Sequence, residues 1–237
     1  MDLTDRVAVV TGGSSGIGLA TAAALGRAGC RLAVCARGRE RLEAAAQELA
    51  GGGSEVLAMP ADVSDPDSVE AFAETVREEM GGADVLVNNA GIGRFDRIDE
   101  ASLEDFDAVF GTNVRGLFLC TRAFLPEMLE RGDGVVVNVA SLAGKNTFQG
   151  GAVYSGSKHA VLAMSKCMML DLRPRGVRVL AICPGSVDTR FFDGQDRFEP
   201  DREKIVASDD VARMIVESVR VSDRATVSEV EIRPVNP

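Results

Sequence analysis

The sequence predicts a single doubly wound α/β domain of the Rossmann type, in which helices cover both faces of a mostly parallel sheet of about seven strands. Two features of the chain predict this fold. Short runs rich in β-branched residues alternate with longer amphipathic stretches, and most of these runs lack polar alternation, as strands buried on both faces do. The length of 237 residues suits one such domain, residues 1–237.

The expected strands and helices follow one another regularly along the chain. The strands are expected at residues 6–11, 31–36, 55–59, 85–88, 135–139, 177–183 and 227–232. The helices are expected near residues 17–28, 39–50, 66–80, 102–130, 152–172 and 208–220. Turn residues support these boundaries, since three glycines follow residue 50 and the Ser64-Asp65-Pro66 sequence provides an N-cap and a first-turn proline. Repeated strand-helix succession implies right-handed crossovers between parallel strands.

The charge and hydropathy of the chain exclude several classes of function. Lys and Arg number 26 against 36 Asp and Glu, which gives a net charge of −10. Nucleic acids and anionic membranes need a concentrated positive field, so neither is an expected partner. No apolar run approaches the roughly 18 residues that a membrane-spanning helix needs. The first residues carry no basic segment followed by an apolar stretch, so the expected location is cytoplasmic.

Histidine and cysteine usage argues against a metal centre. The chain has a single histidine, His159, which excludes sites built on two or three histidines. The five cysteines are scattered and form no CxxC pair, as expected of reduced structural thiols. No metal is therefore predicted, and His159 is expected to be structural.

A glycine-rich turn lies between the first expected strand and the first expected helix. Residues 11–18 read Thr-Gly-Gly-Ser-Ser-Gly-Ile-Gly, in which glycines allow a sharp turn and helix amides can hold phosphate. The spacing is GxxxGxG, unlike the GxGxxG fingerprint of larger dehydrogenases. The same letters match the GxSxG elbow of serine hydrolases at Ser14. That alternative is disfavoured because its triad would need His159, which lies in a helical stretch.

The end of the second expected strand indicates which dinucleotide would bind. About twenty residues after the turn stand Ala36 and Arg37, where a ribose-binding acid would otherwise be found. A guanidinium can bind a 2′-phosphate bidentately, so NADP is favoured over NAD. The alternative is a solvated arginine at a strand end.

Tyr154 and Lys158 lie four residues apart on one face of an expected helix. Tyr154 is the only tyrosine of the chain, and a phenol needs a pKa about three units lower to act as a base at neutral pH. The nearby ammonium, with an oxidised nicotinamide beside it, is expected to lower this pKa in a partly dry cleft. Thirteen residues before Tyr154, Ser141 follows the fifth expected strand, where its hydroxyl could bind a substrate carbonyl.

Further polar clusters follow the other strands. Asp62 and Val63 follow the third strand, Asn89 and its neighbours the fourth, and residues 184–189 the sixth. Because the strands are parallel, all these clusters are expected at one edge of the sheet, with Asn113 nearby in a helical stretch.

In this order and spacing, from residue 11 to residue 189, the chain resembles a short-chain dehydrogenase/reductase of the compact, classical type that uses NADP(H). The resemblance implies a tetrad of Asn113, Ser141, Tyr154 and Lys158 that reduces a carbonyl or oxidises a secondary alcohol. Ser141 would orient the oxygen, Tyr154 would transfer the proton, and Lys158 would bind the nicotinamide ribose and tune Tyr154. Asn113 would anchor a water that refills the proton. The expected cofactor-binding residues are Gly12, Ser14, Ser15, Gly16, Ile17, Gly18, Arg37, Asp62, Val63, Asn89, Ala90, Gly91, Tyr154, Lys158, Pro184, Gly185, Val187 and Thr189.

Other expectations concern substrate and assembly. A long irregular stretch near residues 186–207 is expected to form a substrate lid, and Phe148, Gln149, Phe191 and Phe192 suggest a partly apolar pocket for a small carbonyl or alcohol. Relatives form dimers or tetramers, so a homo-oligomer is expected. An inactive NADP(H)-binding sensor on the same fold is the alternative, although a sensor has no use for a proton relay.

Overall fold

The computed structural model of the protein describes residues 1–193, 201–222 and 224–235. Seven strands form one parallel sheet in the order β3-β2-β1-β4-β5-β6-β7. They are β1 (Val7–Thr11), β2 (Arg31–Ala36), β3 (Val56–Pro60), β4 (Val85–Asn88), β5 (Gly134–Val139), β6 (Val177–Pro184) and β7 (Glu229–Ile232). The strand order reverses between β1 and β4, so the doubly wound fold and its parallel sheet are confirmed.

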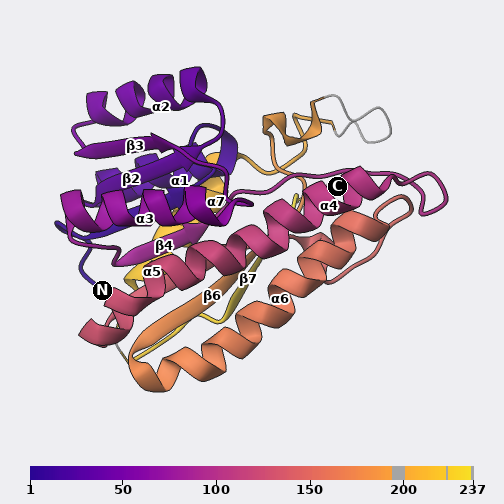
Figure 1. The fold of residues 1–237 in the computed structure, drawn as a ribbon. Helices are drawn as coiled ribbons and strands as arrows, with labels where there is room; N and C mark the ends of the chain where they lie inside the picture. Colours follow the sequence, from indigo (N-terminus) through magenta and orange to yellow (C-terminus); the bar gives the residue numbers. More distant parts are fainter. Residues whose placement is uncertain (194–200, 223, 236–237) are drawn as a thin grey trace.

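Helices cover both faces of the sheet (Figure 1). One layer holds α1 (Gly16–Arg27), α2 (Arg39–Gly51) and α7 (Ser208–Arg220), and the other holds α3 (Pro66–Met80), α5 (Leu117–Arg131) and α6 (Ala152–Leu172). The short helix α4 (Leu103–Phe110) precedes α5. The side chain of Asp65 accepts a hydrogen bond from the Asp67 amide at 3.1 Å, which confirms the predicted N-cap of α3.

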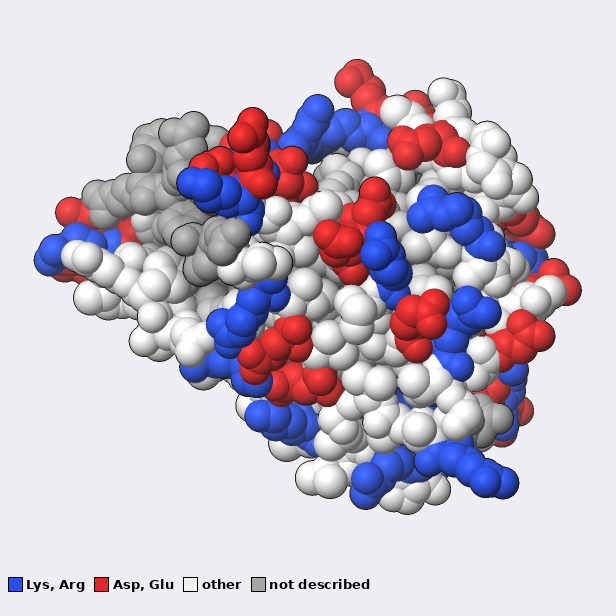
Figure 2. Space-filling model, turned by 180° about the vertical axis from the view of Figure 1, so that it is seen from behind, with Lys and Arg blue, Asp and Glu red and all other residues white. Residues whose placement is uncertain are grey.

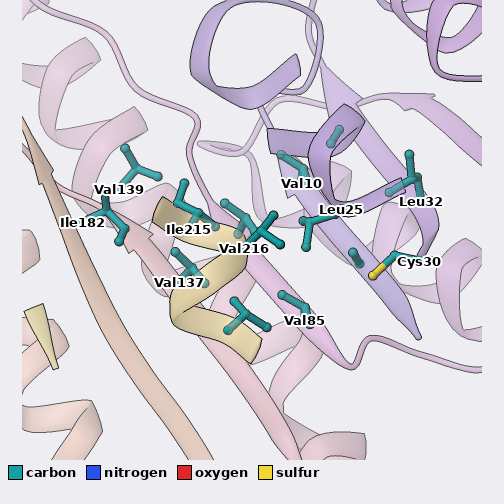
Figure 3. Packing of buried hydrophobic residues seen from close by; sticks show 14 of the residues in the cluster. Val10, Leu25, Cys30, Leu32, Val85, Val137, Val139, Ile182, Ile215 and Val216 are labelled. Carbon is teal, nitrogen blue, oxygen red and sulfur yellow. The ribbon is translucent and has the colours of Figure 1, made fainter. Parts of the chain in front are cut away.

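A hydrophobic core lies on each side of the sheet. Leu25 of α1 and Ile215 of α7 pack onto the strand side chains of one face (Figure 3). On the other face Phe72 of α3 meets Phe124 of α5 edge to face, with ring centroids 5.7 Å apart. Two well-packed faces hold the strands firmly, so the loops at the carboxyl edge start from fixed positions.

The helical stretch expected at residues 102–130 runs from Leu103 to Arg131 and changes its hydrogen-bonding pattern at the centre. A π-helical turn, Gly111–Gly116, separates α4 from α5. Within it the buried Asn113 side chain is fixed by hydrogen bonds to the backbone of Ile92, a residue that follows β4. An inserted residue widens the helix and turns this side chain towards the sheet edge, as π turns at functional sites do. The predicted helical stretch is therefore confirmed, and only the π-helical hydrogen bonding at its centre was not predicted.

The expected lid at residues 186–207 is described only in its flanks, because residues 194–200 lie outside the described residues. Val187 and Val206 pair as a short parallel bridge, and Arg190–Phe192 forms one 3-10 turn. This bridge places the two described flanks of the stretch next to each other.

The cysteines, the metal-binding side chains and the helix lengths of the described part of the chain bear on the expectations from composition. Its five cysteines are all unpaired, and its residues include no group of three metal-binding side chains. No helix among the described residues has the length and apolar character needed to span a bilayer. Basic and acidic side chains lie interspersed on the face seen from behind (Figure 2).

Candidate functional site

A cleft of about 840 Å³ lies along the carboxyl ends of the strands. Nearly all of the site residues predicted from the sequence line it, and Gly18 and Asn113 lie immediately behind its wall. The predicted residues that line it are Gly12, Ser14, Ser15, Gly16, Ile17, Arg37, Asp62, Val63, Asn89, Ala90, Gly91, Ser141, Tyr154, Lys158, Pro184, Gly185, Val187 and Thr189. The sheet topology thus brings together clusters that are distant in the sequence.

The glycine turn between β1 and α1 closes one wall of the cleft. Gly12 adopts a positive φ of 67°, and a Cβ atom on Gly18 would lie 2.3 Å from the Gly12 carbonyl oxygen. Only glycine fits these two positions. Helix α1 starts after Ser15 without a side-chain cap, so its first amides and its positive dipole end border the cleft. This arrangement suits a diphosphate.

Asn89 holds the glycine turn in place. Its Nδ2 donates hydrogen bonds to the Thr11 and Gly12 carbonyl oxygens at 2.9 and 3.3 Å. The Thr11 hydroxyl in turn accepts from the Asn89 and Ala90 amides at 3.1 and 3.0 Å. Thr11 was not predicted as a site residue, although a threonine at a strand end beside a glycine turn is a readable signal. These hydrogen bonds therefore fix the conformation of the glycine turn.

Two arginines stand at the far end of the cleft. Arg37 was predicted there, and Arg41, one turn later in α2, lines the same wall and was missed. A Cβ atom on Gly38 would lie 3.4 Å from Nη2 of Arg41, so this guanidinium folds back over the end of β2. Burial acts to raise the pKa of Asp62, but hydrogen bonds from Ser64 and the charge of Arg37 lower it. The four-residue spacing of the arginines could have revealed Arg41.

Ser141 and Tyr154 meet at the centre of the cleft. The Ser141 hydroxyl accepts from the Ala143 amide at 3.1 Å, contacts the Pro184 carbonyl oxygen at 3.4 Å and forms a hydrogen bond with Tyr154. Tyr154 is only 8% exposed. Burial raises the pKa of its phenol to about 12, and the hydrogen bond with Ser141 acts in the opposite direction.

Lys158 lies one helical turn from Tyr154, as predicted, but its ammonium is directed elsewhere. Nζ donates a hydrogen bond of 2.9 Å to the Val139 carbonyl oxygen and lies 5.9 Å from the centroid of the Tyr154 ring. Burial lowers the pKa of Lys158 to about 8. In the protein alone desolvation dominates both groups, so the pKa of the phenol is raised there, and a lowering of this pKa by Lys158 together with an oxidised nicotinamide stays a prediction.

Asn113 supports the site through backbone contacts. Its Nδ2 donates to the Ile92 carbonyl oxygen and the Ser157 hydroxyl, both at 3.0 Å, and its Oδ1 accepts from the Ile92 amide at 2.9 Å. The side chain is thus committed to fixing the loop after β4. A small cavity of about 10 Å³ lies between Asn113, Lys158 and Asn88. The buried Oδ1 of Asn88 has no hydrogen-bond partner among the described residues, and this space is about the size of one water.

Aromatic side chains surround Tyr154. Phe95, from the loop after β4, meets the Tyr154 ring at 5.3 Å with an interplanar angle of 89°, and Phe191 lies 5.5 Å from it. Phe148, from the loop before α6, contacts Phe95 at 5.7 Å. Phe148 and Phe191 were expected near a pocket, and both line the cleft, whereas Phe95 was missed. The cleft is therefore apolar next to the phenol.

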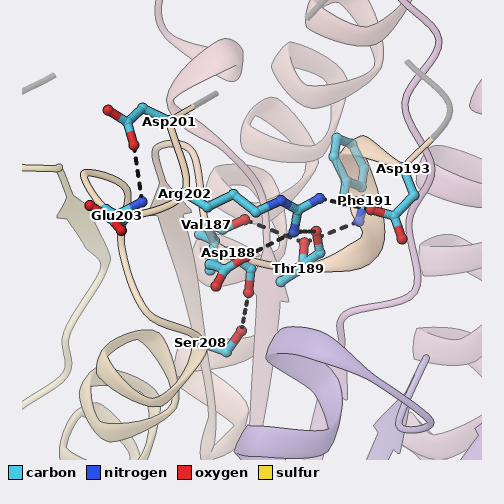
Figure 4. Close-up of polar contacts among 9 residues, drawn as sticks. All are labelled: Val187, Asp188, Thr189, Phe191, Asp193, Asp201, Arg202, Glu203 and Ser208. Carbon is cyan, nitrogen blue, oxygen red and sulfur yellow. Dashed lines mark hydrogen bonds and ion pairs between the residues drawn. The ribbon is translucent and has the colours of Figure 1, made fainter. Parts of the chain in front are cut away.

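An ion-pair network holds the turn that carries Thr189 and Phe191 (Figure 4). One nitrogen of Arg202 donates to Oδ1 of Asp188 at 2.8 Å and to the Thr189 carbonyl oxygen at 3.0 Å, and the other donates to Oδ1 of Asp193 at 2.7 Å. The Thr189 hydroxyl accepts from the Phe191 amide at 3.2 Å. Arg202 therefore fixes the segment that lies against Gly16 and Tyr154.

His159, the only histidine, takes no part in this site. It lies exposed on α6, and its Nδ1 pairs with the Ser155 carbonyl oxygen at 2.8 Å. Ser14 lines the cleft and His159 does not, so His159 cannot serve as the base of a triad with Ser14.

Comparison with known proteins agrees with this geometry. Residues 6–199 match the family described as short chain dehydrogenase. An uncharacterized oxidoreductase of Staphylococcus aureus is 31% identical over 98% of this chain and 99% of its own length. An alcohol dehydrogenase from the archaeon Thermococcus sibiricus, solved with 5-hydroxy-NADP, has a TM-score of 0.90 at 34% identity, covering 98% of this chain and 97% of that one. A dehydrogenase/reductase from Burkholderia phymatum, solved with NAD, has a TM-score of 0.89 at 29% identity, covering 98% and 90%. The chain belongs to the short-chain dehydrogenase family of oxidoreductases.

Proposed function

We propose that this protein is an NADP(H)-dependent oxidoreductase that interconverts a carbonyl and a secondary alcohol, with Tyr154 as the proton donor and acceptor. The observation that carries the proposal is the meeting of Ser141 and Tyr154 in a cleft that also contains the glycine turn. The turn suits a dinucleotide diphosphate. The Ser141 hydroxyl and the Tyr154 phenol are close enough for both to form a hydrogen bond with one substrate oxygen.

The residues of the cleft fit a nicotinamide dinucleotide along its length. Gly12, Gly16 and the first amides of α1 would hold the diphosphate, since side chains at these glycines would fill the cradle. Asp62 and Val63 would flank the adenine, and residues 184–189 the nicotinamide. When bound, the reduced cofactor supplies a hydride to the carbonyl carbon of the substrate.

Arg37 and Arg41 support a preference for NADP over NAD. Both guanidiniums line the end of the cleft at the carboxyl end of β2, where a 2′-phosphate would extend from the ribose. Ala36 and Arg37 offer no carboxylate to a free ribose hydroxyl. Two cations beside one phosphate make a charge-assisted contact that NAD cannot form.

In the reductive direction Ser141 would donate a hydrogen bond to the carbonyl oxygen and so polarise it. Tyr154 would then give its proton to the same oxygen as the alcohol forms. In the protein alone the buried phenol carries its proton at neutral pH, as a proton donor must. Lys158 would hold the nicotinamide ribose and restore the proton, with the small cavity beside Asn88 as room for a relaying water.

The described surface supports assembly into a dimer or tetramer. Helices α4, α5 and α6 expose large apolar side chains, namely Leu103, Phe106, Phe118 and Leu170. Apolar side chains concentrated on neighbouring helices favour contact with a second copy. The unpaired cysteines suit the proposed cytoplasmic location.

The proposal is tested by the absorbance of NADPH with a panel of ketones, 3-oxo esters and hydroxy acids. Tyr154→Phe keeps the ring and removes only the transferable proton, so we expect turnover to fall at least about a hundredfold while NADPH binding stays within about threefold. Binding is measured by NADPH fluorescence. Full activity of Tyr154→Phe would refute the proton-transfer role, and NADPH binding with no turnover of any substrate would favour a sensor.

A further inference from the structure

We infer that the substrate is a neutral ketone whose larger substituent carries an aromatic ring, and that Phe95, Phe148 and Phe191 form the surface that recognises this ring. The inference rests on the proposed function and assigns its substrate class. It comes from the arrangement of the rings around Tyr154 and from the charges at the margin of the cleft.

The reacting oxygen must lie within hydrogen-bond reach of both Ser141 and Tyr154, which fixes one end of the substrate. The substituents then extend along the Tyr154 ring, where Phe95 and Phe191 stand at 5.3 and 5.5 Å between centroids. Phe148 continues the same wall beyond Phe95. Rings from three separate loops thus meet beside the phenol, and each belongs to the lining of the cleft.

The geometry of these rings is that of aromatic recognition. The Phe95 and Tyr154 planes are at 89°, and the Phe95 and Phe148 planes at 65°. Edge-to-face pairs place positive ring edges against negative ring faces, so a further aromatic ring continues the pattern where an alkyl group cannot. Phe148 is 39% exposed, so part of its ring remains available to a molecule entering the cleft.

Charge decides against a cationic substituent, which aromatic walls also attract. Lys158 lies 5.9 Å from the centroid of the Tyr154 ring, and Arg94 and Arg190 line the same part of the cleft. These positive groups would repel an ammonium. Arg94 is already engaged by Asp105 at 3.0 Å. The carboxylate of Asp193 lines the cleft beside Arg190, so the positive groups do not form an unopposed site for an anionic substituent. A neutral aromatic group fits both the rings and the charges.

The reaction is balanced as the reduction of a ketone. The cofactor hydride forms the new C–H bond, the Tyr154 proton forms the new O–H bond, and the C=O π bond becomes a C–O single bond. The products are a secondary alcohol and NADP⁺.

The test compares two ketones that differ only in the ring, 1-phenyl-2-propanone and 1-cyclohexyl-2-propanone. Neither conjugates its ring with the carbonyl, so their intrinsic reactivities are close. We expect kcat/KM to be at least about tenfold higher for the phenyl ketone. Phe148→Leu removes the most exposed of the three rings and should lower this ratio by about threefold or more. Met214→Ala, which truncates a similarly exposed apolar side chain on α7 outside the cleft, should leave the ratio unchanged.

A binding measurement separates this inference from the proposed function. The dissociation constants of the two corresponding alcohols are measured calorimetrically with NADP⁺-loaded Tyr154→Phe, which cannot complete the reaction. Tighter binding of the phenyl alcohol supports the ring-binding surface. Equal kcat/KM values for the two ketones would overturn the inference and leave the proposed function intact. Tighter binding or faster turnover of a trimethylammonium analogue would overturn the assignment of a neutral substituent. Failure to reduce any ketone would refute the proposed function and this inference with it.

Discussion

The buried ammonium of Lys158 should make the stability of the protein depend on pH in a defined range. The side chain is 5% exposed, and burial lowers its pKa from 10.5 to about 8. At neutral pH the native protein therefore holds a proton at a site that disfavours it. In the unfolded chain the same group titrates at its ordinary pKa. Lys158→Met removes the charge and keeps most of the apolar chain.

The magnitude follows from the two pKa values. The gap between 10.5 and about 8 corresponds to about 3 kcal/mol, because one pKa unit is worth about 1.4 kcal/mol. Between about pH 8 and about pH 10.5 the unfolded state binds more protons at this group than the native state. The contribution of Lys158 to the free energy of unfolding therefore rises with pH across this window. Below about pH 8 the full penalty is present, and above about pH 10.5 it is absent.

The assay is urea unfolding of the protein without cofactor, for the wild type and Lys158→Met, from about pH 7 to about pH 10.5. Burial raises the pKa of Cys35 and Tyr154, so these groups lower stability as pH rises above their ordinary values. Their contribution is common to both proteins and cancels in the difference. The stability of Lys158→Met relative to wild type should therefore fall by about 3 kcal/mol across the range.

Lys166→Met provides the matched control, because Lys166 lies exposed on the same helix. Its stability should follow the wild-type pH curve. Parallel curves for wild type and Lys158→Met would refute the reasoning, since they would mean that the ammonium of Lys158 is not desolvated in the native state.

Two further predictions concern the ends of the cleft. Arg37→Ala combined with Arg41→Ala should weaken NADPH binding by about a hundredfold and NADH binding by less than about threefold, because each charge-assisted hydrogen bond to a phosphate contributes at least about 1.5 kcal/mol. Calorimetric titration measures both, and an equal loss for the two cofactors would show that these arginines do not read the phosphate. Arg202→Gln should raise KM by about two- to tenfold, because exposed ion pairs are individually weak. Added salt screens such pairs, so it should raise the KM of the wild type in the same way. Lys204→Ala, which removes only a pair with Asp201, is its control, and a matching KM for both variants would contradict the positioning role of Arg202.

The sheet could be predicted because each strand carries its own signal. Val135, Val136 and Val137 are consecutive apolar residues that point to both faces, so they could be placed in a covered parallel sheet from sequence alone. The π turn at Asn113 could not, because it depends on hydrogen bonds to Ile92, twenty-one residues away, whose position only the folded sheet determines. The stretch of residues 102–130 as a whole predicts an ordinary helix, and the tertiary contact changes its hydrogen bonding at Asn113.

The site residues could be predicted where a strand ended in an unusual cluster. Ser141 and Arg37 were found because parallel strands deliver their carboxyl ends to one edge. Arg41 was missed because it lies inside a charged helical stretch, where only its four-residue spacing from Arg37 distinguishes it from a solvated arginine. Phe95 lies in a loop whose path is set by Asn113, so no spacing rule places its ring against Tyr154.

The direction of the Tyr154 pKa shift could not be predicted from the spacing of Tyr154 and Lys158 in the sequence. A spacing of four residues places Lys158 on the same helical face, but it does not fix the atom that the ammonium contacts. In the structure that atom is the Val139 carbonyl oxygen, and the phenol faces Phe95 and Phe191. Desolvation then disfavours the charged form of both groups, which raises the pKa of Tyr154 and lowers that of Lys158. A tyrosine in this state holds its proton and a lysine in this state releases one readily, which is compatible with the proposed transfer of a proton to a carbonyl oxygen. Alcohol oxidation needs the opposite charge distribution, and it therefore requires a stronger positive field at the phenol than the protein alone provides.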